Sequence, residues 1–273
     1  MVIRELKDGS SIVSSQEDHA ELSAQFAAHW GNRDFSRLRP YETMVFATTY
    51  HDSGYREWEG NPPMNVLKRR PYAHREEIPS FEPIELRAYA RNVEWVRSQD
   101  RYAGLLVSMH RTGLWQNRYD TFTNPKGRSR ERSTGVKAAK QQLETQQQEE
   151  KTSLGLGNPT FENDLWFNYR ALQIYDLLSL YFCCDGYSDD DHFKEDVLAP
   201  IRFSYDSQAE VELRIVPTGV RSVRMVPYPF DIAPLTVTAR ARVIPPGNYA
   251  SEAACLEAYH KAPRKLLSFE IAQ

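Results

Sequence analysis

The spacing of apolar residues predicts helices over much of the first two thirds of the chain. A short hairpin is expected over residues 2–14, followed by a helix from about Gln16 whose inner face carries Leu22 and Phe26. A second helix is expected after Pro40. This part of the chain therefore predicts a hairpin that leads into a helical body.

The middle of the chain continues the helical pattern between two irregular segments. Residues 55–82 are rich in proline and predict a loop, and residues 83–110 predict helix with a break near residues 98–102. Residues 124–158 are polar and glutamine-rich, and predict a mobile insertion or a solvent-exposed helix. Residues 160–184 are apolar on all sides, which is typical of the central helix of a bundle.

The pattern changes to strands near the C-terminus. Apolar residues alternate with period two in 211–216, 223–227, 235–245 and 266–272, and residues 251–261 predict a short helix. The acidic segment 188–196 is expected at the start of a helix, where carboxylates favour the helix dipole.

These elements predict a mainly α protein, α+β overall, in which a helical bundle carries a small C-terminal antiparallel sheet. The helical domain is expected over residues 1–200, with its polar insertion at 124–158. The small sheet, residues 201–273, is expected to pack on the helices so that both form one compact unit.

Composition limits the classes of partner. The 273 residues carry 34 Lys and Arg against 37 Asp and Glu, and a net charge of −3 argues against a broadly basic nucleic-acid surface. No apolar run has the length of a signal peptide or of a membrane span. The three cysteines, two of them adjacent, do not suggest a disulfide framework. We expect a cytoplasmic protein that binds neither nucleic acid nor membrane; its oligomeric state stays open.

Five histidine and aspartate residues on or beside the expected helices stand out as candidate metal ligands. His19 lies one turn before the apolar face of its helix, His51 is followed directly by Asp52, and His110 lies four residues after a leucine. Asp176 has apolar neighbours on every side, and burying it unpaired would cost several kcal/mol. Such a set suits a divalent metal. Structural histidines and an arginine partner for the aspartate are the alternative.

The order of these residues resembles the HD-domain superfamily of metal-dependent enzymes, in which a His, a His-Asp doublet and a final Asp bind the metal. The wider chain resembles family 3891 of the domains of unknown function. The matching segments are QEDHAELSAQFAAHWG (16–31), HDSGYREWEGNP (51–62), YAGLLVSMH (102–110), LQIYDLLSLYFC (172–183) and VPYPFD (226–231).

The superfamily resemblance implies a ligand set and a fold. His19, His51, Asp52 and Asp176 would bind the metal, and the helices would form an HD-like bundle. Dinuclear members have further histidines between the doublet and the last Asp. In this chain His74 and His110 lie in that interval, and His110 is the better candidate for a metal ligand. One or two ions of Fe, Mn, Mg or Zn are therefore expected.

Residues near the doublet supply the remaining candidates. Asp52, His110 and Tyr55 are the expected catalytic residues. Trp58 and His74 are expected to contact the substrate, together with Arg69 and Arg70 of a basic cluster suited to a phosphate or carboxylate. The simpler interpretation of this cluster is surface solubility.

The function expected from these residues is a metal-dependent enzyme acting on a small, partly apolar molecule with an anionic end. A hydrolase of phosphate or related groups is favoured, because most HD-domain proteins are phosphohydrolases. The alternatives are a non-haem di-iron oxygenase, a metal-dependent cyclase or lyase of a hydrophobic diphosphate, and a non-catalytic ligand-binding protein.

Overall fold

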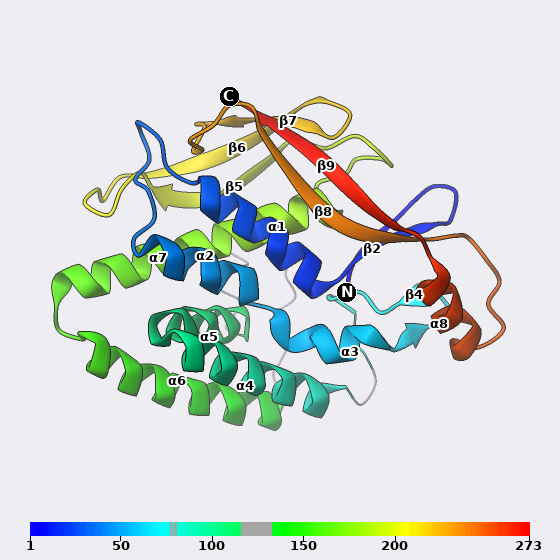
Figure 1. Cartoon of the computed structure of the whole chain (residues 1–273), viewed down its shortest axis with the longest axis horizontal. Helices are drawn as coiled ribbons and strands as arrows, with labels where there is room; N and C mark the ends of the chain where they lie inside the picture. The colour runs from blue at the N-terminus through cyan, green and yellow to red at the C-terminus, as the bar shows by residue number, and fades with distance from the viewer. Residues whose placement is uncertain (77, 79–80, 116–132) are drawn as a thin grey trace.

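A curled sheet covers two layers of helices in the computed structural model, which describes residues 1–76, 78, 81–115 and 133–273 (Figure 1). The sheet has seven strands in the order β1-β2-β8-β9-β7-β6-β5. The expectation of a mainly α, HD-like bundle with a small C-terminal antiparallel sheet is therefore wrong, and the protein is α+β. The reason is that strands from the N-terminus and from the segment after the central helix enlarge the sheet.

Most neighbouring strands of the sheet are antiparallel, but β7 pairs with β9 in parallel, which makes the sheet mixed. In β8, buried and more exposed residues alternate, with Leu235, Val237 and Ala239 facing the helices. The strands are β1 (Val2–Glu5), β2 (Ser11–Ser14), β5 (Asp196–Arg202), β6 (Glu210–Gly219), β7 (Ser222–Val226), β8 (Leu235–Ile244) and β9 (Arg264–Ala272).

The expected N-terminal hairpin forms and joins the sheet through the pairing of β2 with β8. Helix α1 (Gln16–His29) follows β2 directly. Its start is a capping box, in which the Ser15 hydroxyl accepts from the backbone of Asp18 while the Asp18 carboxylate accepts from the backbone of Ser15. The sheet and the cap together fix where α1 begins, and so place His19 one turn into the helix.

The acidic segment 188–196 does not begin a helix, contrary to expectation. The Asp189 carboxylate accepts hydrogen bonds from the backbone N–H groups of Asp191 and His192, which closes a turn. The chain then enters strand β5, where Val197 and Ile201 favour extended backbone.

The inner helical layer consists of α1, α2 (Tyr41–Tyr50) and α7 (Pro159–Leu180), which continues into η3 (Tyr181–Asp185). Helix α1 packs against β8 on one side and against α2 and α7 on the other. As expected, α7 is buried on nearly all sides and contacts α1, α2, α5 and β5. Within the described residues, no helix is both long and apolar enough to cross a membrane.

The outer helical layer consists of α4 (Glu82–Gln99), α5 (Arg101–Trp115) and α6 (Thr134–Leu154). The expected break falls at Asp100, whose carboxylate accepts from the Ala103 backbone N–H at 2.9 Å and so caps α5. Residues 124–132 of the expected insertion lie outside the described residues. The rest contains α6, which is largely polar but buries Val136 and Leu143 toward α4 and α5.

The segment expected to be an irregular loop contains several short elements. They are η1 (Ser53–Tyr55), α3 (Arg56–Gly60), β3 (Met64–Asn65) and β4 (Arg70–Pro71), and helix α8 (Glu252–Lys261) packs against the last two. Two contacts hold the start of this segment to α4. The Asn92 side chain donates to the carbonyl oxygens of Tyr50 and His51, and Gly54 lies so close to α4 that an added Cβ would be 2.5 Å from the Ala88 carbonyl oxygen.

Replacing Gly54 with alanine is expected to lower the free energy of unfolding by about 1–3 kcal/mol, because the methyl group would push η1 away from α4. Gly60→Ala is the matched control, since a Cβ there meets nothing within 4 Å. Urea denaturation of both variants measures the difference. Equal stabilities would show that the close approach of Gly54 to α4 is unimportant.

Candidate metal centre

Five of the side chains expected as metal ligands converge inside the helical layers. His19 comes from α1, His51 and Asp52 from the end of α2, His110 from α5 and Asp176 from α7, and all five are buried. Ligand atoms of His19, His51 and Asp176 lie within 4.8 Å of one another, and so do those of His51, Asp52 and His110. The two groups share His51, so the five residues form one continuous cluster.

Hydrogen bonding assigns the proton on the ring of His19. The Ser179 hydroxyl donates to the Asp176 carbonyl oxygen at 2.7 Å, so its oxygen accepts from the Nδ1–H of His19, also at 2.7 Å. This leaves a lone pair on Nε2, which faces Asp52 Oδ2 at 3.2 Å. Two electron-pair donors therefore face each other, an arrangement that a proton or a cation must bridge.

The ring of His51 is oriented in the same way. Its Nδ1–H donates to the carbonyl oxygen of Thr48 at 2.7 Å, because a carbonyl can only accept. Its Nε2 is buried with no hydrogen-bond partner and lies 3.5 Å from Asp176 Oδ1 and 3.9 Å from Asp52 Oδ2. The second imidazole thus also directs its Nε2 toward the two carboxylates.

The charges of the cluster control its protonation. Burial alone would lower the pKa of His51, but the carboxylates of Asp52 and Asp176 outweigh it and raise the pKa to about 9. Burial would raise the pKa of Asp52, but His51, His19 and Arg111 hold it well below its ordinary range. The two buried carboxylates therefore require positive charge, which protonated His51 and Arg111 provide and which a metal ion could provide in place of the proton.

His110 completes the cluster as a neutral imidazole. Its ring centroid is 4.9 Å from that of His51, and burial together with the charge of His51 lowers its pKa to about 3. Gln16 also contacts the cluster, since its amide Nε2 lies 3.5 Å from Asp52 Oδ2.

This donor set fits a divalent metal. It offers neutral imidazole nitrogens and carboxylate oxygens on elements held by hydrogen bonds outside the cluster, which is how metal ligands are usually oriented. The buried His and Asp groups could therefore hold a metal ion. The geometry leaves its identity and the number of ions open.

The other expected site residues do not join the cluster. Tyr55 is buried, and its hydroxyl donates to Glu85 at 3.1 Å. Trp58 is half-buried between the rings of Tyr55 and Phe81. Both belong to an aromatic layer between α3 and α4.

The residues of the expected basic cluster do not form one anion-binding surface. Arg69 is exposed, whereas Arg70 is buried and bound by the carboxylates of Glu5 and Glu76. Both ring nitrogens of His74 are buried without hydrogen-bond partners, and burial and the charge of Arg75 lower its pKa to about 4.

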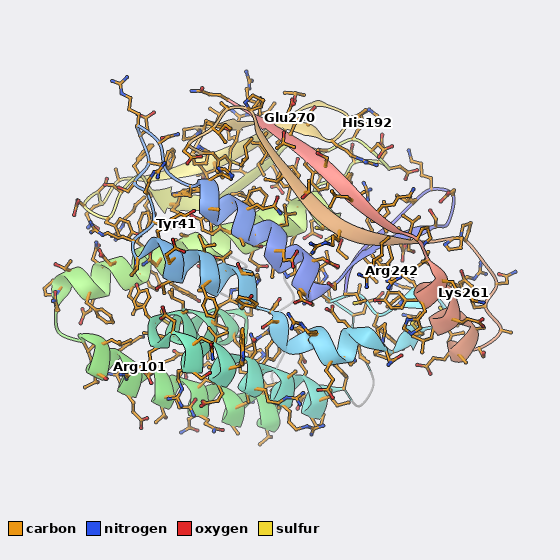
Figure 2. All side chains as sticks on the ribbon, in the orientation of Figure 1. Tyr41, Arg101, His192, Arg242, Lys261 and Glu270 are labelled. Carbon is orange, nitrogen blue, oxygen red and sulfur yellow. The ribbon has the colours of Figure 1, made fainter. Side chains whose placement is uncertain are left out.

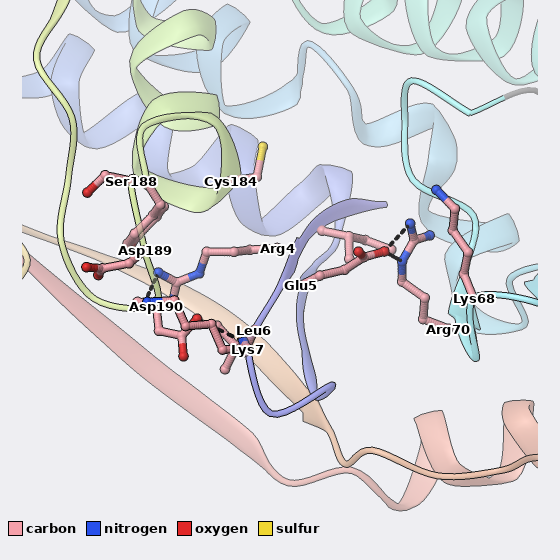
Figure 3. Close-up of a pocket in the computed structure, with 12 residues that line it drawn as sticks. Arg4, Glu5, Leu6, Lys7, Lys68, Arg70, Cys184, Ser188, Asp189 and Asp190 are labelled. Carbon is pink, nitrogen blue, oxygen red and sulfur yellow. Dashed lines mark hydrogen bonds and ion pairs between the residues drawn. The ribbon is translucent and has the colours of Figure 1, made fainter.

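A pocket of about 570 Å³ lies beside this region, between the N-terminal hairpin, the loop around Arg70 and residues 184–190 (Figure 3). None of the five clustered residues lines it. Of its two buried arginines, Arg70 binds two carboxylates, whereas Arg4 donates through Nη1 to the Asp190 carbonyl oxygen and leaves Nε and Nη2 without hydrogen-bond partners. The pocket is therefore separate from the candidate metal centre.

Two residues of the cluster's surroundings are absent from the sequence-based candidates. Ser179 lies three residues after Asp176 on the same face of α7, and Arg111 directly follows His110 in the apolar segment LLVSMHRTGLW. The sequence signal for Arg111 is the same as for Asp176: a charged residue on the buried face of an apolar helix needs a partner of opposite charge.

Comparison with known proteins gives the chain a family. A protein family of unknown function, DUF3891, matches residues 1–246. The chain belongs to the DUF3891 family. No curated protein and no solved structure matches it significantly. Membership of DUF3891 assigns neither a metal nor a reaction, and the likeness to the HD-domain superfamily stays a hypothesis based on the order of the ligands.

Replacing Ser179 with alanine is expected to weaken divalent-metal binding by about 10–100-fold, because the hydrogen bond that orients His19 is lost. Ser23→Ala is the matched control: Ser23 is equally buried and also contacts His19, but through the backbone carbonyl oxygen. Metal titration by calorimetry measures both affinities. Equal affinities in the two variants would argue against Ser179 as an orienting partner.

Proposed function

We propose that this DUF3891 protein is a metal-dependent hydrolase of a small molecule bearing a phosphate or related anionic group. The observation that carries the proposal is the pair of imidazole Nε2 atoms directed at two buried carboxylates, His19 toward Asp52 and His51 toward Asp176. Such an arrangement is costly without a cation and suits a divalent one.

The order of the ligands supports the same chemistry. His19, then His51 and Asp52, then Asp176 is the order of metal ligands in the HD-domain superfamily, most of whose members are phosphohydrolases. This likeness concerns the order of the ligands and not the fold, because the protein contains a seven-stranded sheet and is not a helical bundle.

The chain's own residues would hold and shield the reacting group. A bound divalent ion would supply a polarised phosphoryl oxygen and a water of lowered pKa. Asp52 directs Oδ2 toward the imidazoles and Oδ1 toward Arg111, so that Oδ1 could accept a hydrogen bond from the attacking water. The helices bury the cluster and exclude bulk water. Tyr55 has no role in this proposal, since its hydroxyl is bonded to Glu85.

A di-iron oxygenase is the second candidate, favoured by one observation. The five donors are imidazoles and carboxylates, which also suit iron, although His51 could bind only one of two ions because its Nδ1–H is bonded to Thr48. Oxygen consumption by the iron-loaded protein, with two irons per chain, would favour this candidate over the hydrolase.

The metal-loaded protein is expected to release phosphate from a generic substrate such as p-nitrophenyl phosphate. Asp176→Asn should lower this activity by about 100-fold or more, because it removes a charge that balances the metal. Chelation should abolish the wild-type activity, and adding the metal back should restore it. Absorbance of released nitrophenol measures both effects.

The control is a His-Asp pair outside the cluster. His192 Nδ1 lies 2.9 Å from Asp189 Oδ1, the His192 side chain is 59% exposed, and His192 lies on the sheet side of the molecule (Figure 2). His192→Ala should leave the activity unchanged. If the wild type retained no metal and released no phosphate, and Asp176→Asn only lost stability, a non-catalytic protein with structural histidines would be the correct interpretation.

A further inference from the structure

Arg111 is a buried cation at the edge of the metal cluster. Its side chain is only 8% exposed, and its guanidinium lies over the ring of Tyr89, 2.9 Å from the ring centroid. Trp115 flanks it at 5.8 Å. The two rings hold the guanidinium in one orientation next to His110 on α5.

One edge of the Arg111 guanidinium, Nε and Nη2, has no short hydrogen bond to a carboxylate. Its Nε–H is buried without a hydrogen-bond partner, and Nη2 lies 3.4 Å from Asp52 Oδ1. Charge-assisted hydrogen bonds are normally about 2.7–2.9 Å long. Nε–H and Nη2 form one edge of the guanidinium, so the edge suited to binding two oxygens of an anion is the one that lacks strong partners.

Arg70 is a buried arginine of this chain whose guanidinium is fully bonded to carboxylates. Its Nε and Nη1 donate to Glu5 and Glu76 at 2.8 Å, and its Nη2 lies within 2.9 Å of both carboxylates. Arg111 is also buried, but its one contact with a carboxylate is long. Because an incompletely bonded buried cation is costly, the contrast points to a ligand for Arg111.

The small residual exposure of the cluster belongs to the carboxylates and to Arg111. The side chains of Asp52 and Asp176 are 7% and 6% exposed, and that of Arg111 is 8%, whereas those of His51 and His19 are 0% and 2% exposed. A ligand would therefore approach the cluster beside the carboxylates and Arg111, not past the imidazoles.

We propose that the Nε–Nη2 edge of Arg111 binds a phosphate-type oxyanion next to the metal centre, and so selects substrates with a tetrahedral anionic group. This inference rests on the proposed function, because the anion would lie between Arg111 and the metal. Arg111 would contribute two parallel N–H donors, the geometry for which a guanidinium is suited and an ammonium is not.

Phosphate binding by the metal-loaded protein tests this assignment. Calorimetric titration with inorganic phosphate should show binding by the wild type. Arg111→Gln should weaken it by about 10–100-fold, and Arg111→Lys should also weaken it because the two-donor edge is lost. Metal content, measured in the same samples, should stay at the wild-type level in Arg111→Lys, which keeps the charge beside Asp52.

Arg101→Gln is the matched control. Arg101 is also on α5, but it lies at the opposite end, on the outside of the helical layers, and binds Glu150 (Figure 2). Its replacement should leave phosphate affinity unchanged. Equal phosphate affinity in wild type and Arg111→Lys, with full metal content in both, would overturn the role of Arg111 alone. A wild type that binds no metal would overturn the proposed function, and the anion site with it.

Discussion

The central constraint on this protein is the burial of two carboxylates, Asp52 and Asp176, against imidazoles whose Nε2 atoms face them. Isolated buried carboxylates would cost several kcal/mol each, so their charge must be balanced within the cluster. Hydrogen bonds from His19 to Ser179 and from His51 to Thr48 hold the rings in the orientation that does this. The cluster could therefore hold a metal ion in place of a proton, and the surrounding helices bury it.

The sheet and the helices position this cluster from several directions. Strand β2 and the capping box fix α1 and with it His19, while Asn92 and the close approach of Gly54 hold the His51-Asp52 doublet against α4. Asp176 lies in the buried C-terminal half of α7, about one turn before the helix ends at Leu180. Residues distant in sequence thus meet because three layers of secondary structure pack around one point.

Much of the candidate site could be predicted from the sequence, because charged and polar residues stand out where the apolar pattern predicts a buried helix face. A charged residue within an apolar helix, as at Asp176, and histidines on apolar faces indicate a buried polar cluster without any knowledge of the fold. The sheet could not be predicted to the same extent. Its assembly depends on long-range pairing, such as β2 with β8 and β7 with β9, which local periodicity does not specify. Arg70 and Arg111 show a similar limit: only the structure reveals that the first is fully bonded and the second is not.

The most direct test of the account is the metal content of the purified protein. Elemental analysis after exposure to divalent metals and removal of unbound ions should find one or two equivalents in the wild type. The His51→Ala variant should retain much less, because His51 belongs to both groups of candidate ligands. A wild type that retains no more metal than His51→Ala, while folding normally, would contradict the central claim that the buried carboxylates and imidazoles form a metal site.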